Sequence, residues 1–167
     1  VDESLEISIL RYFNPIGAHS SGLLGEDPSL GSDNVMSNIF KVLKSELDYF
    51  SIYGDNYSTK DGTGVRDYIH VEDLIEGHHA AFNLLQQKRE CSDNLRVFNL
   101  GTGKGYSVLE ILDTFENQSG VKIPRKVMKK RPGDVDVCFA DPSSANSILK
   151  WKADSSLEKM CLDSWNF

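Results

Sequence analysis

An apolar run near the start of the chain places the strongest constraint on the fold. Residues 6–13, EISILRYF, are almost all apolar or β-branched. Such a run predicts a strand that is covered on both faces, as in a parallel sheet with helices on either side. Asn14 and Pro15 follow directly, and we expect them to end the strand, because proline cannot donate to a strand ladder.

Downstream, segments with helical periodicity alternate with short strand-like segments. Helices are predicted after an N-cap at Asn34 (with apolar spacing out to Leu47), over residues 71–87, from the capping box 107–110 to Gly120, from Asp141 and Pro142, and over 157–165. Strands are predicted at Phe50–Tyr53, Leu95–Leu100 and 123–128, and loops at 16–33 and 55–67. The fold class is therefore α/β, with mixed α and β in one compact unit.

Composition narrows the class of protein. The 167 residues suffice for about one domain, and the net charge of −7 disfavours nucleic acid and anionic membrane as partners. Three widely spaced cysteines (Cys91, Cys138 and Cys161) suggest neither a disulfide framework nor a zinc site, and are expected to be reduced thiols in the cytoplasm. There is no apolar run of about 20 residues and no signal peptide. The start at Val1 indicates a fragment or a processed product.

The segment Gly101-Thr-Gly-Lys-Gly105 resembles a phosphate-binding loop, because it follows a predicted strand and precedes a predicted helix. The match is poor. A dinucleotide fingerprint requires a third glycine where Tyr106 stands, and a P-loop requires a longer spacing before Gly-Lys-Ser/Thr. A tight turn that leads into the Ser107 cap is the favoured interpretation.

Two arginines beside glycines, Arg66 and Arg131, could hold a diphosphate, because the guanidinium fork matches phosphate oxygens. Spacing alone favours solvated loop arginines paired with aspartates. The four histidines, including the adjacent His78 and His79, show no metal-ligand spacing, so no metal site is predicted. From the residues alone, the chain is an α/β domain with a candidate anion site.

Several longer motifs resemble the UDP-glucose 4-epimerases, a family of extended short-chain dehydrogenases. They are LRYFNPIGAH at 10–19, SGLLGEDP at 21–28, YSTKDGTGVRDYIHV at 57–71, FNLGTGKGYSV at 98–108, RPGD at 131–134 and ADPS at 140–143. They occur in the family's order and cover nearly the whole chain. A related nucleotide-sugar dehydratase or decarboxylase is an alternative that the GTGVRDYIHV block disfavours.

The resemblance implies an enzyme that holds NAD in an N-terminal Rossmann domain and grips a UDP-sugar in a smaller C-terminal domain. Residues 1–15 would be the last part of the Rossmann domain, and 16–167 the UDP-sugar-binding domain, interleaved with the remaining Rossmann elements. The N-terminal Rossmann core is missing. The implied reaction interconverts UDP-glucose and UDP-galactose, in galactose metabolism, through a 4-keto intermediate.

The resemblance also implies roles for individual residues. Phe13 would contact the NAD nicotinamide, and Asn14 would hydrogen-bond the UDP-sugar. The diphosphate would meet Asn34 and Val35 at a helix N-terminus. The remaining implied contacts are a uracil-binding edge strand at Ser51, Ile52 and Tyr53, a diphosphate clamp from Arg66 and Arg131, and a ribose contact from Asp134. Cys138 stands where the family varies between a large aromatic and a small residue, so the parent enzyme is expected to accept UDP-N-acetylhexosamines as well.

Two sequence features of the family are absent from this chain. The glycine-rich fingerprint is missing, and no tyrosine here has a lysine four residues later, so no catalytic residue is named and the chain alone is expected to be inactive. Without the rest of its sheet, the strand at 6–13 would expose apolar faces. The parent is expected to be a homodimer, paired through its missing half. An inactive nucleotide-sugar-binding fragment stays open as the alternative function.

Overall fold

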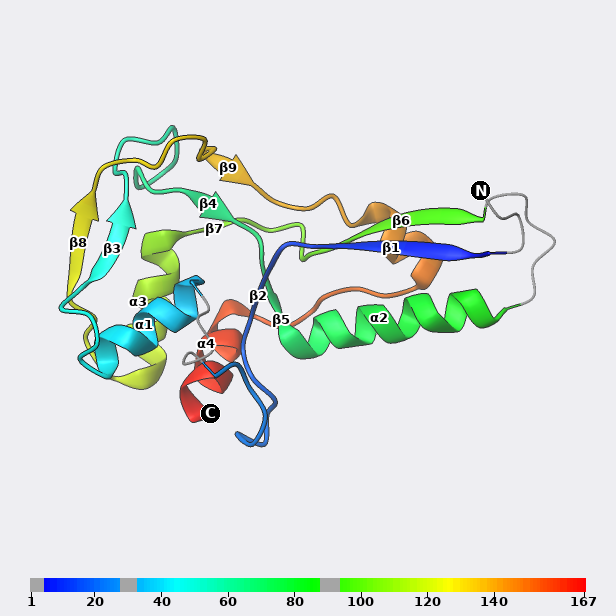
Figure 1. Cartoon of the computed structure of the whole chain (residues 1–167), viewed down its shortest axis with the longest axis horizontal. Helices are drawn as coiled ribbons and strands as arrows, with labels where there is room; N and C mark the ends of the chain where they lie inside the picture. Colours follow the sequence, from blue (N-terminus) through cyan, green and yellow to red (C-terminus); the bar gives the residue numbers. More distant parts are fainter. Residues whose placement is uncertain (1–4, 28–32, 88–93) are drawn as a thin grey trace.

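The computed structural model describes residues 5–27, 33–87 and 94–167, and shows an elongated molecule in which strands and helices alternate (Figure 1). The helices are α1 (Val35–Leu43), α2 (Val71–Gln86), α3 (Val108–Ser119), the π-helix η2 (Ala145–Leu149) and α4 (Leu157–Asn166). The strands are β1 (Ile7–Tyr12), β2 (Asn14–Ile16), β3 (Phe50–Tyr53), β4 (Val65–Arg66), β5 (Tyr68–His70), β6 (Leu95–Leu100), β7 (Tyr106–Ser107), β8 (Arg125–Met128) and β9 (Val137–Cys138).

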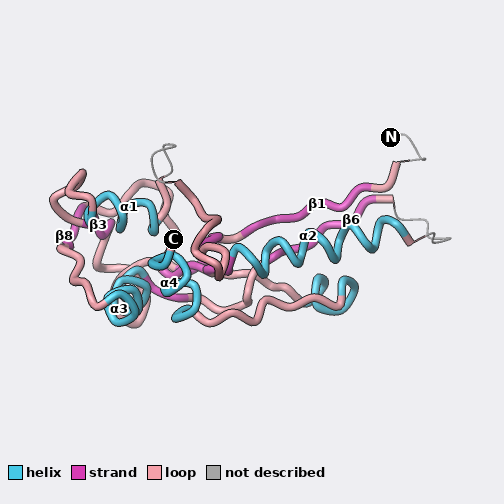
Figure 2. The backbone as a smooth tube through the Cα atoms, turned by 90° about the horizontal axis from the view of Figure 1, so that it is seen from below, coloured by secondary structure: helices cyan, strands magenta, loops and turns pink. Residues whose placement is uncertain are grey.

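One end of the molecule is built on the parallel pair β1–β6, which runs in register from Ile7 opposite Leu95 to Tyr12 opposite Leu100. Helix α2 and the η2 segment lie on one side of this pair (Figure 2). Between them is a core to which β6 contributes Phe98 and Leu100, β5 contributes Ile69, and α2 and the segment 145–153 contribute further residues, with Leu10 of β1 packed against it.

The opposite face of β1–β6 is bare within the described residues. Ile9 is 42% exposed and its partner Val97 is 37% exposed, and Leu5, Ile7 and Leu95 are exposed as well. The prediction of a strand covered on both faces is therefore wrong for this chain. The expectation that apolar faces would be exposed is confirmed.

The other end holds a second core, to which α1, α3 and α4 contribute together with β3, and β3 pairs in parallel with β8. Phe115 of α3 lies at its centre with no exposed surface. The rings of Phe40 and Trp165 meet it edge to face, at centroid distances of 5.9 and 6.0 Å. This geometry is favourable for aromatic quadrupoles and fixes α1 and α4 against α3.

Two small sheets connect the ends. Strand β2 pairs in parallel with β5, while β4 pairs with β7 and β9. Strand β1 ends at Tyr12, so the predicted strand end before Asn14 and Pro15 is confirmed, but these two residues then begin a separate strand, β2. Proline is tolerated there because alternate residues of a parallel strand bond to a given neighbour, and the Asn14 N–H is the one that donates to the Asp67 carbonyl, at 2.9 Å.

Local signals explain most helix ends. Asn34 and Ser107 cap α1 and α3 through capping boxes, and Gly120 ends α3 in the left-handed conformation at φ 73°. Helix α1 stops at Leu43 and does not reach Leu47, because Ser45 has φ 59°. Within the described ranges, no helix is long and apolar enough to cross a bilayer.

Candidate functional site

A pocket of about 1230 Å³ opens between the two ends of the molecule. Strands β2, β3 and β4, the start of α1, the start of α2 and the segment 131–134 contribute to its wall. Of the residues singled out from the sequence, those that line the pocket are Asn14, Asn34, Val35, Ser51, Tyr53, Arg66, Arg131 and Asp134. Five separate stretches of sequence thus converge on one cavity, and the ligand contacts assigned to them stay predictions.

An arginine pair marks one part of this pocket. Arg131 donates from Nε to Asp134 Oδ2 at 2.9 Å, and Arg66 Nη2 lies 3.7 Å from Asp134 Oδ1. Arg66 also donates from Nη1 to the carbonyls of Val65 and Val135. One carboxylate therefore stands between two guanidinium groups that face the same cavity.

The charges of this group support one another. Burial alone would raise the pKa of Asp134, but hydrogen bonding and charge from Arg131, with help from Tyr57 and Arg66, outweigh it and lower that pKa. The hydrogen bond to Asp134 raises the pKa of Arg131. Two fixed cations against one carboxylate leave a net positive charge, which suits a dianionic or trianionic ligand.

An aromatic face lies beside the arginines. Tyr53, at the end of β3, is exposed, and the Arg131 guanidinium carbon lies 4.6 Å from the centre of its ring. Side chains alternate along a strand, so Ser51 and Tyr53 face the pocket while Ile52 turns into the core. Ile52 could therefore contact a ligand at this edge through its backbone but not through its side chain.

The two asparagines differ in what they can offer. Asn34 Oδ1 accepts the Ser37 N–H at 2.8 Å, and its Nδ2 donates to Glu26 at 2.6 Å, so its side chain is occupied in capping α1. The start of α1 itself, with Val35, faces the pocket and carries the positive end of the helix dipole. Asn14 is exposed in β2.

Three of the residues expected from the sequence do not line this pocket. These are Phe13, Ile52 and Cys138. Phe13 lies just beyond β1, against Gly101, where an added Cβ would come within 3.2 Å of the Phe13 ring. Cys138 is exposed in β9, directly opposite Arg66 in the β4–β9 register.

The glycine segment 101–105 wraps around an anion that belongs to the chain itself. The Asp67 carboxylate is fully buried and accepts hydrogen bonds from the Thr102 N–H and hydroxyl, at 3.0 and 2.6 Å. It also accepts the Gly103 and Ala140 N–H groups, at 2.9 and 3.1 Å. The segment also runs through β7 into the Ser107 cap, so the interpretation as a structural turn is confirmed.

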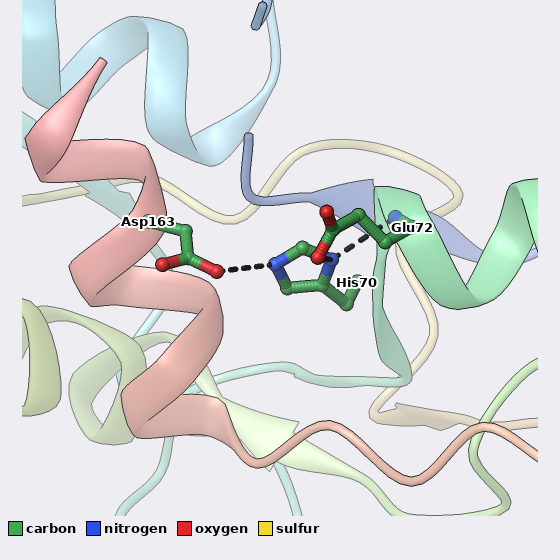
Figure 3. A group of neighbouring side chains, drawn as sticks. All are labelled: His70, Glu72 and Asp163. Carbon is green, nitrogen blue, oxygen red and sulfur yellow. Dashed lines mark hydrogen bonds and ion pairs between the residues drawn. The ribbon is translucent and has the colours of Figure 1, made fainter. Parts of the chain in front are cut away.

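A cluster of His70, Glu72 and Asp163 lies at the junction of α4 with the start of α2, with candidate ligand atoms within 4.8 Å of one another (Figure 3). His70 Nδ1 accepts the Glu72 N–H at 3.0 Å, so Nε2 must carry the proton that it shares with Asp163, also at 3.0 Å. Both imidazole nitrogens are thus in use.

The Lys159 ammonium pairs with both Glu72 and Asp163 and occupies the position that a cation would take. Burial opposes the charge of Asp163, but hydrogen bonds from Lys159 and His70 outweigh it and lower the pKa of this carboxyl. The chemistry of the cluster is therefore that of an ion-pair network that fixes α4, and not that of a metal centre.

Sequence reasoning missed two residues of the site. Tyr57 lines the pocket together with the arginine pair. Asp67 lies between β4 and β5, directly after Arg66, and its backbone carbonyl accepts the Asn14 N–H. Tyr57 opens the YSTKDGTGVRDYIHV motif, but its position in a polar loop gave no sign that its ring is buried. Asp67 directly follows Arg66. The spacing of apolar residues, from which burial is predicted, does not identify a single buried carboxylate.

The chain matches one protein-family model and several curated proteins. The family model described as GDP-mannose 4,6 dehydratase matches residues 2–164. The UDP-glucose 4-epimerase of Bacillus subtilis is 48% identical over 166 residues, which are 99% of this chain and 48% of that protein. The chain spans about half the length of the curated relatives it matches.

Solved structures give the same result. The UDP-glucose 4-epimerase of Stenotrophomonas maltophila, with bound NAD and formylated UDP-arabinopyranose, superimposes with a TM-score of 0.89 at 46% identity, over 96% of this chain and 47% of that one. The enzyme of Bifidobacterium longum, in complex with NAD+ and UDP, gives 0.88 at 47% identity, over 99% and 48%.

Proposed function

Because the chain belongs to the family described as GDP-mannose 4,6 dehydratase, which is a group of extended short-chain dehydrogenases, we propose that it is the nucleotide-sugar-binding part of an NAD-dependent UDP-glucose 4-epimerase. The observation that carries the proposal is the arginine pair Arg66 and Arg131, held on either side of Asp134 beside the ring of Tyr53. A diphosphate and a pyrimidine base need these two surfaces next to each other.

The binding roles follow from the walls of the pocket. The edge of β3 at Ser51, Ile52 and Tyr53 takes the uracil, and Asp134 accepts a ribose hydroxyl on an oxygen lone pair that its arginines leave free. The diphosphate lies between the arginine pair and the start of α1 at Asn34 and Val35. Asn14 holds the sugar. These roles are supported by the convergence of eight of the named side chains on the cavity.

Among the residues named above, Phe13 alone is proposed to contact NAD, at its nicotinamide end. Phe13 lies at the carboxyl end of the parallel pair β1–β6, which is the edge where open parallel sheets bind cofactors. The Phe13 ring lies close to Gly101, where an added Cβ would come within 3.2 Å of it, and we propose that this ring contacts the nicotinamide. When bound, NAD supplies hydride transfer at C4 of the sugar.

Catalysis requires more than this chain. The sequence contains no tyrosine followed four residues later by lysine, so we propose that the chain by itself binds a UDP-sugar without epimerising it. The second candidate function, a nucleotide-sugar-binding fragment without an active partner, rests on the same observation. Epimerase activity from the chain together with its relatives' N-terminal half separates the two.

Three finer properties are proposed for the parent enzyme. It acts in galactose metabolism, it is located in the cytoplasm, and it forms a homodimer through the half that this chain does not contain. The first is supported by the relatives' names, and all three by the family resemblance. Acceptance of N-acetylated sugars is proposed from the small side chain of Cys138.

Isothermal titration of the chain with UDP tests the proposal, with ADP as the matched ligand of equal charge. The proposal predicts that UDP binds and that ADP binds at least about tenfold more weakly, because only uracil fits the β3 edge. A folded chain, checked by circular dichroism, that binds neither ligand or binds both equally would contradict it.

A further inference from the structure

Tyr57 occupies an unusual position for a tyrosine in a polar loop. It is 5% exposed, and its hydroxyl donates to Asp134 Oδ2 at 3.3 Å. Burial and the neighbouring Asp134 carboxylate raise the pKa of Tyr57, so the phenol stays protonated and remains a donor. The sequence motif assigned it no role.

The same oxygen of Asp134 also accepts the hydrogen bond from Arg131 Nε, while Arg66 Nη2 forms an ion pair with the other oxygen. Tyr57 is therefore the third partner of the carboxylate that separates the two arginines, and its second hydrogen-bond donor. A carboxylate with two arginine partners alone could rotate about its last torsion, whereas a third, rigid partner restricts that rotation.

The ring of Tyr57 is itself well fixed. The Lys130 ammonium lies 3.8 Å from the ring centre and pairs with Asp136 at 3.1 Å. On another side, Gly54 has φ +88°, and a Cβ there would stand 2.6 Å from the Tyr57 ring. A glycine is needed at this turn both for its conformation and for the approach of the ring.

Arg131 shows what this arrangement achieves. Its Nε bonds to Asp134 and its guanidinium plane lies over Tyr53, so in the described part of the chain its terminal nitrogens are left to face the pocket. If the carboxylate turned, the guanidinium would turn with it, and a bidentate contact to phosphate needs a fixed orientation.

We propose that Tyr57 is a positioning residue for the diphosphate: its hydroxyl fixes Asp134, and Asp134 fixes the arginine pair. The inference rests on the proposed function, because it takes a nucleoside diphosphate as the ligand. It concerns orientation and not contact, since the Tyr57 hydroxyl donates to the Asp134 carboxylate.

The test compares Tyr57→Phe with the unmodified chain in titrations with UDP and with uracil, which lacks both the diphosphate and the ribose that Asp134 would contact, followed by NMR. Loss of one charge-assisted hydrogen bond should weaken UDP binding about 5- to 10-fold and leave uracil binding within about twofold. The matched control is Tyr49→Phe, because Tyr49 also lies beneath a lysine, Lys126 at 5.1 Å, but does not line the pocket. It should change neither affinity.

A purely structural role would weaken both ligands by the same factor, so that result, or unchanged UDP binding, would overturn the inference while leaving the proposed function intact. Failure of the unmodified chain to bind UDP would instead overturn the proposed function, and the inference with it. Thermal unfolding of both variants verifies that they are folded during the titrations.

Discussion

Single residues determine how the pocket presents charge. Asp134 holds Arg131 through Nε and Arg66 through Nη2, so the two guanidinium groups share one anchor. Arg131 also lies over the face of Tyr53. A lysine has neither the flat surface nor the fixed planar fork of donors that these contacts need.

Arg131→Lys is therefore expected to lower the affinity of the chain for UDP about tenfold or more, although the positive charge is kept. Isothermal titration measures the change. Arg11→Lys, on the exposed part of β1, is the matched control and should bind as the unmodified chain does. Equal affinity in the Arg131→Lys variant would show that the orientation of the guanidinium is unimportant.

Cys138→Tyr tests the proposed acceptance of N-acetylated sugars and is measured in the full-length enzyme. A bulky ring next to Arg66 should reduce kcat/KM for UDP-N-acetylglucosamine about tenfold or more, with UDP-glucose changed less than about threefold. Cys138→Ala, which keeps the side chain small, should retain both activities. If both substrates survive equally in Cys138→Tyr, the position does not control substrate size.

At the scale of elements, the sequence predicts those helix and strand boundaries that a single residue type determines. The caps at Asn34 and Ser107 and the stop at Gly120 are read directly from residue type. The strand predicted from Ile123 begins at Arg125 because Pro124 precedes it. The helix expected from Pro142 forms, but as the π-helical η2, which no residue pattern in the sequence specified.

The site was predictable only in part, for a physical reason. Arg66 and Arg131 are 65 positions apart, and only pairing of β4 with β7 and β9 brings their loops together. Motif resemblance identified them, whereas Tyr57 and Asp67 depend on burial, which the sequence of a polar loop does not reveal. Long-range packing thus accounts for what sequence reasoning missed.

Asp67 joins β4, β5 and the glycine segment, so Asp67→Asn should destabilise the fold by about 3 kcal/mol. The amide would turn an N–H₂ group toward the backbone donors of Thr102 or Gly103 and leave one of them unpaired. Urea unfolding measures the loss. Asp154→Asn, at an exposed ion pair with Lys152, is the control and should cost less than about 0.5 kcal/mol. Similar losses in both variants would contradict the structural role of Asp67.

Glu116 ties α3 to β8. Burial would raise the pKa of its carboxyl, but hydrogen bonds from Lys122, the Ile123 N–H and Arg125 outweigh it and lower the pKa to about 2. Since the folded pKa lies below the ordinary value of 4.5, the stabilisation is complete above about pH 4.5 and is lost as the pH falls toward 2.

Glu116→Gln should therefore lower stability by about 2 kcal/mol at pH 7 and flatten the dependence of stability on pH between about 4.5 and 2. Denaturant unfolding over that range measures both effects. Glu6→Gln, at an exposed position, should leave the pH dependence unchanged. An unchanged slope in Glu116→Gln would show that this carboxyl is not the group that titrates.

At the scale of the whole molecule, the bare face of β1–β6 is the main departure from a self-sufficient domain. Ile9 and Val97 are paired across the two strands and exposed, while Leu10 and Phe98, the next pair, face the core. The relatives are about twice as long as this chain, and a parallel sheet in this family is expected to continue beyond β1–β6.

The double variant Ile9→Thr and Val97→Thr should reduce self-association of the chain and change its stability by less than about 1 kcal/mol, because both residues lie on the exposed face of the sheet. Sedimentation velocity and urea unfolding measure the two quantities. Phe98→Ala, on the covered face, should instead cost about 3 kcal/mol or more. Strong destabilisation by the double variant would show that this face is already packed.

The proposal that this chain grips UDP is tested by a titration of the isotope-labelled chain with UDP, followed by amide NMR spectra. The largest shifts are expected at β3, at Arg66 and in the segment 131–134, with smaller shifts at the start of α1. Absence of shifts in a folded chain, or shifts confined to β1, β6 and α2, would contradict it.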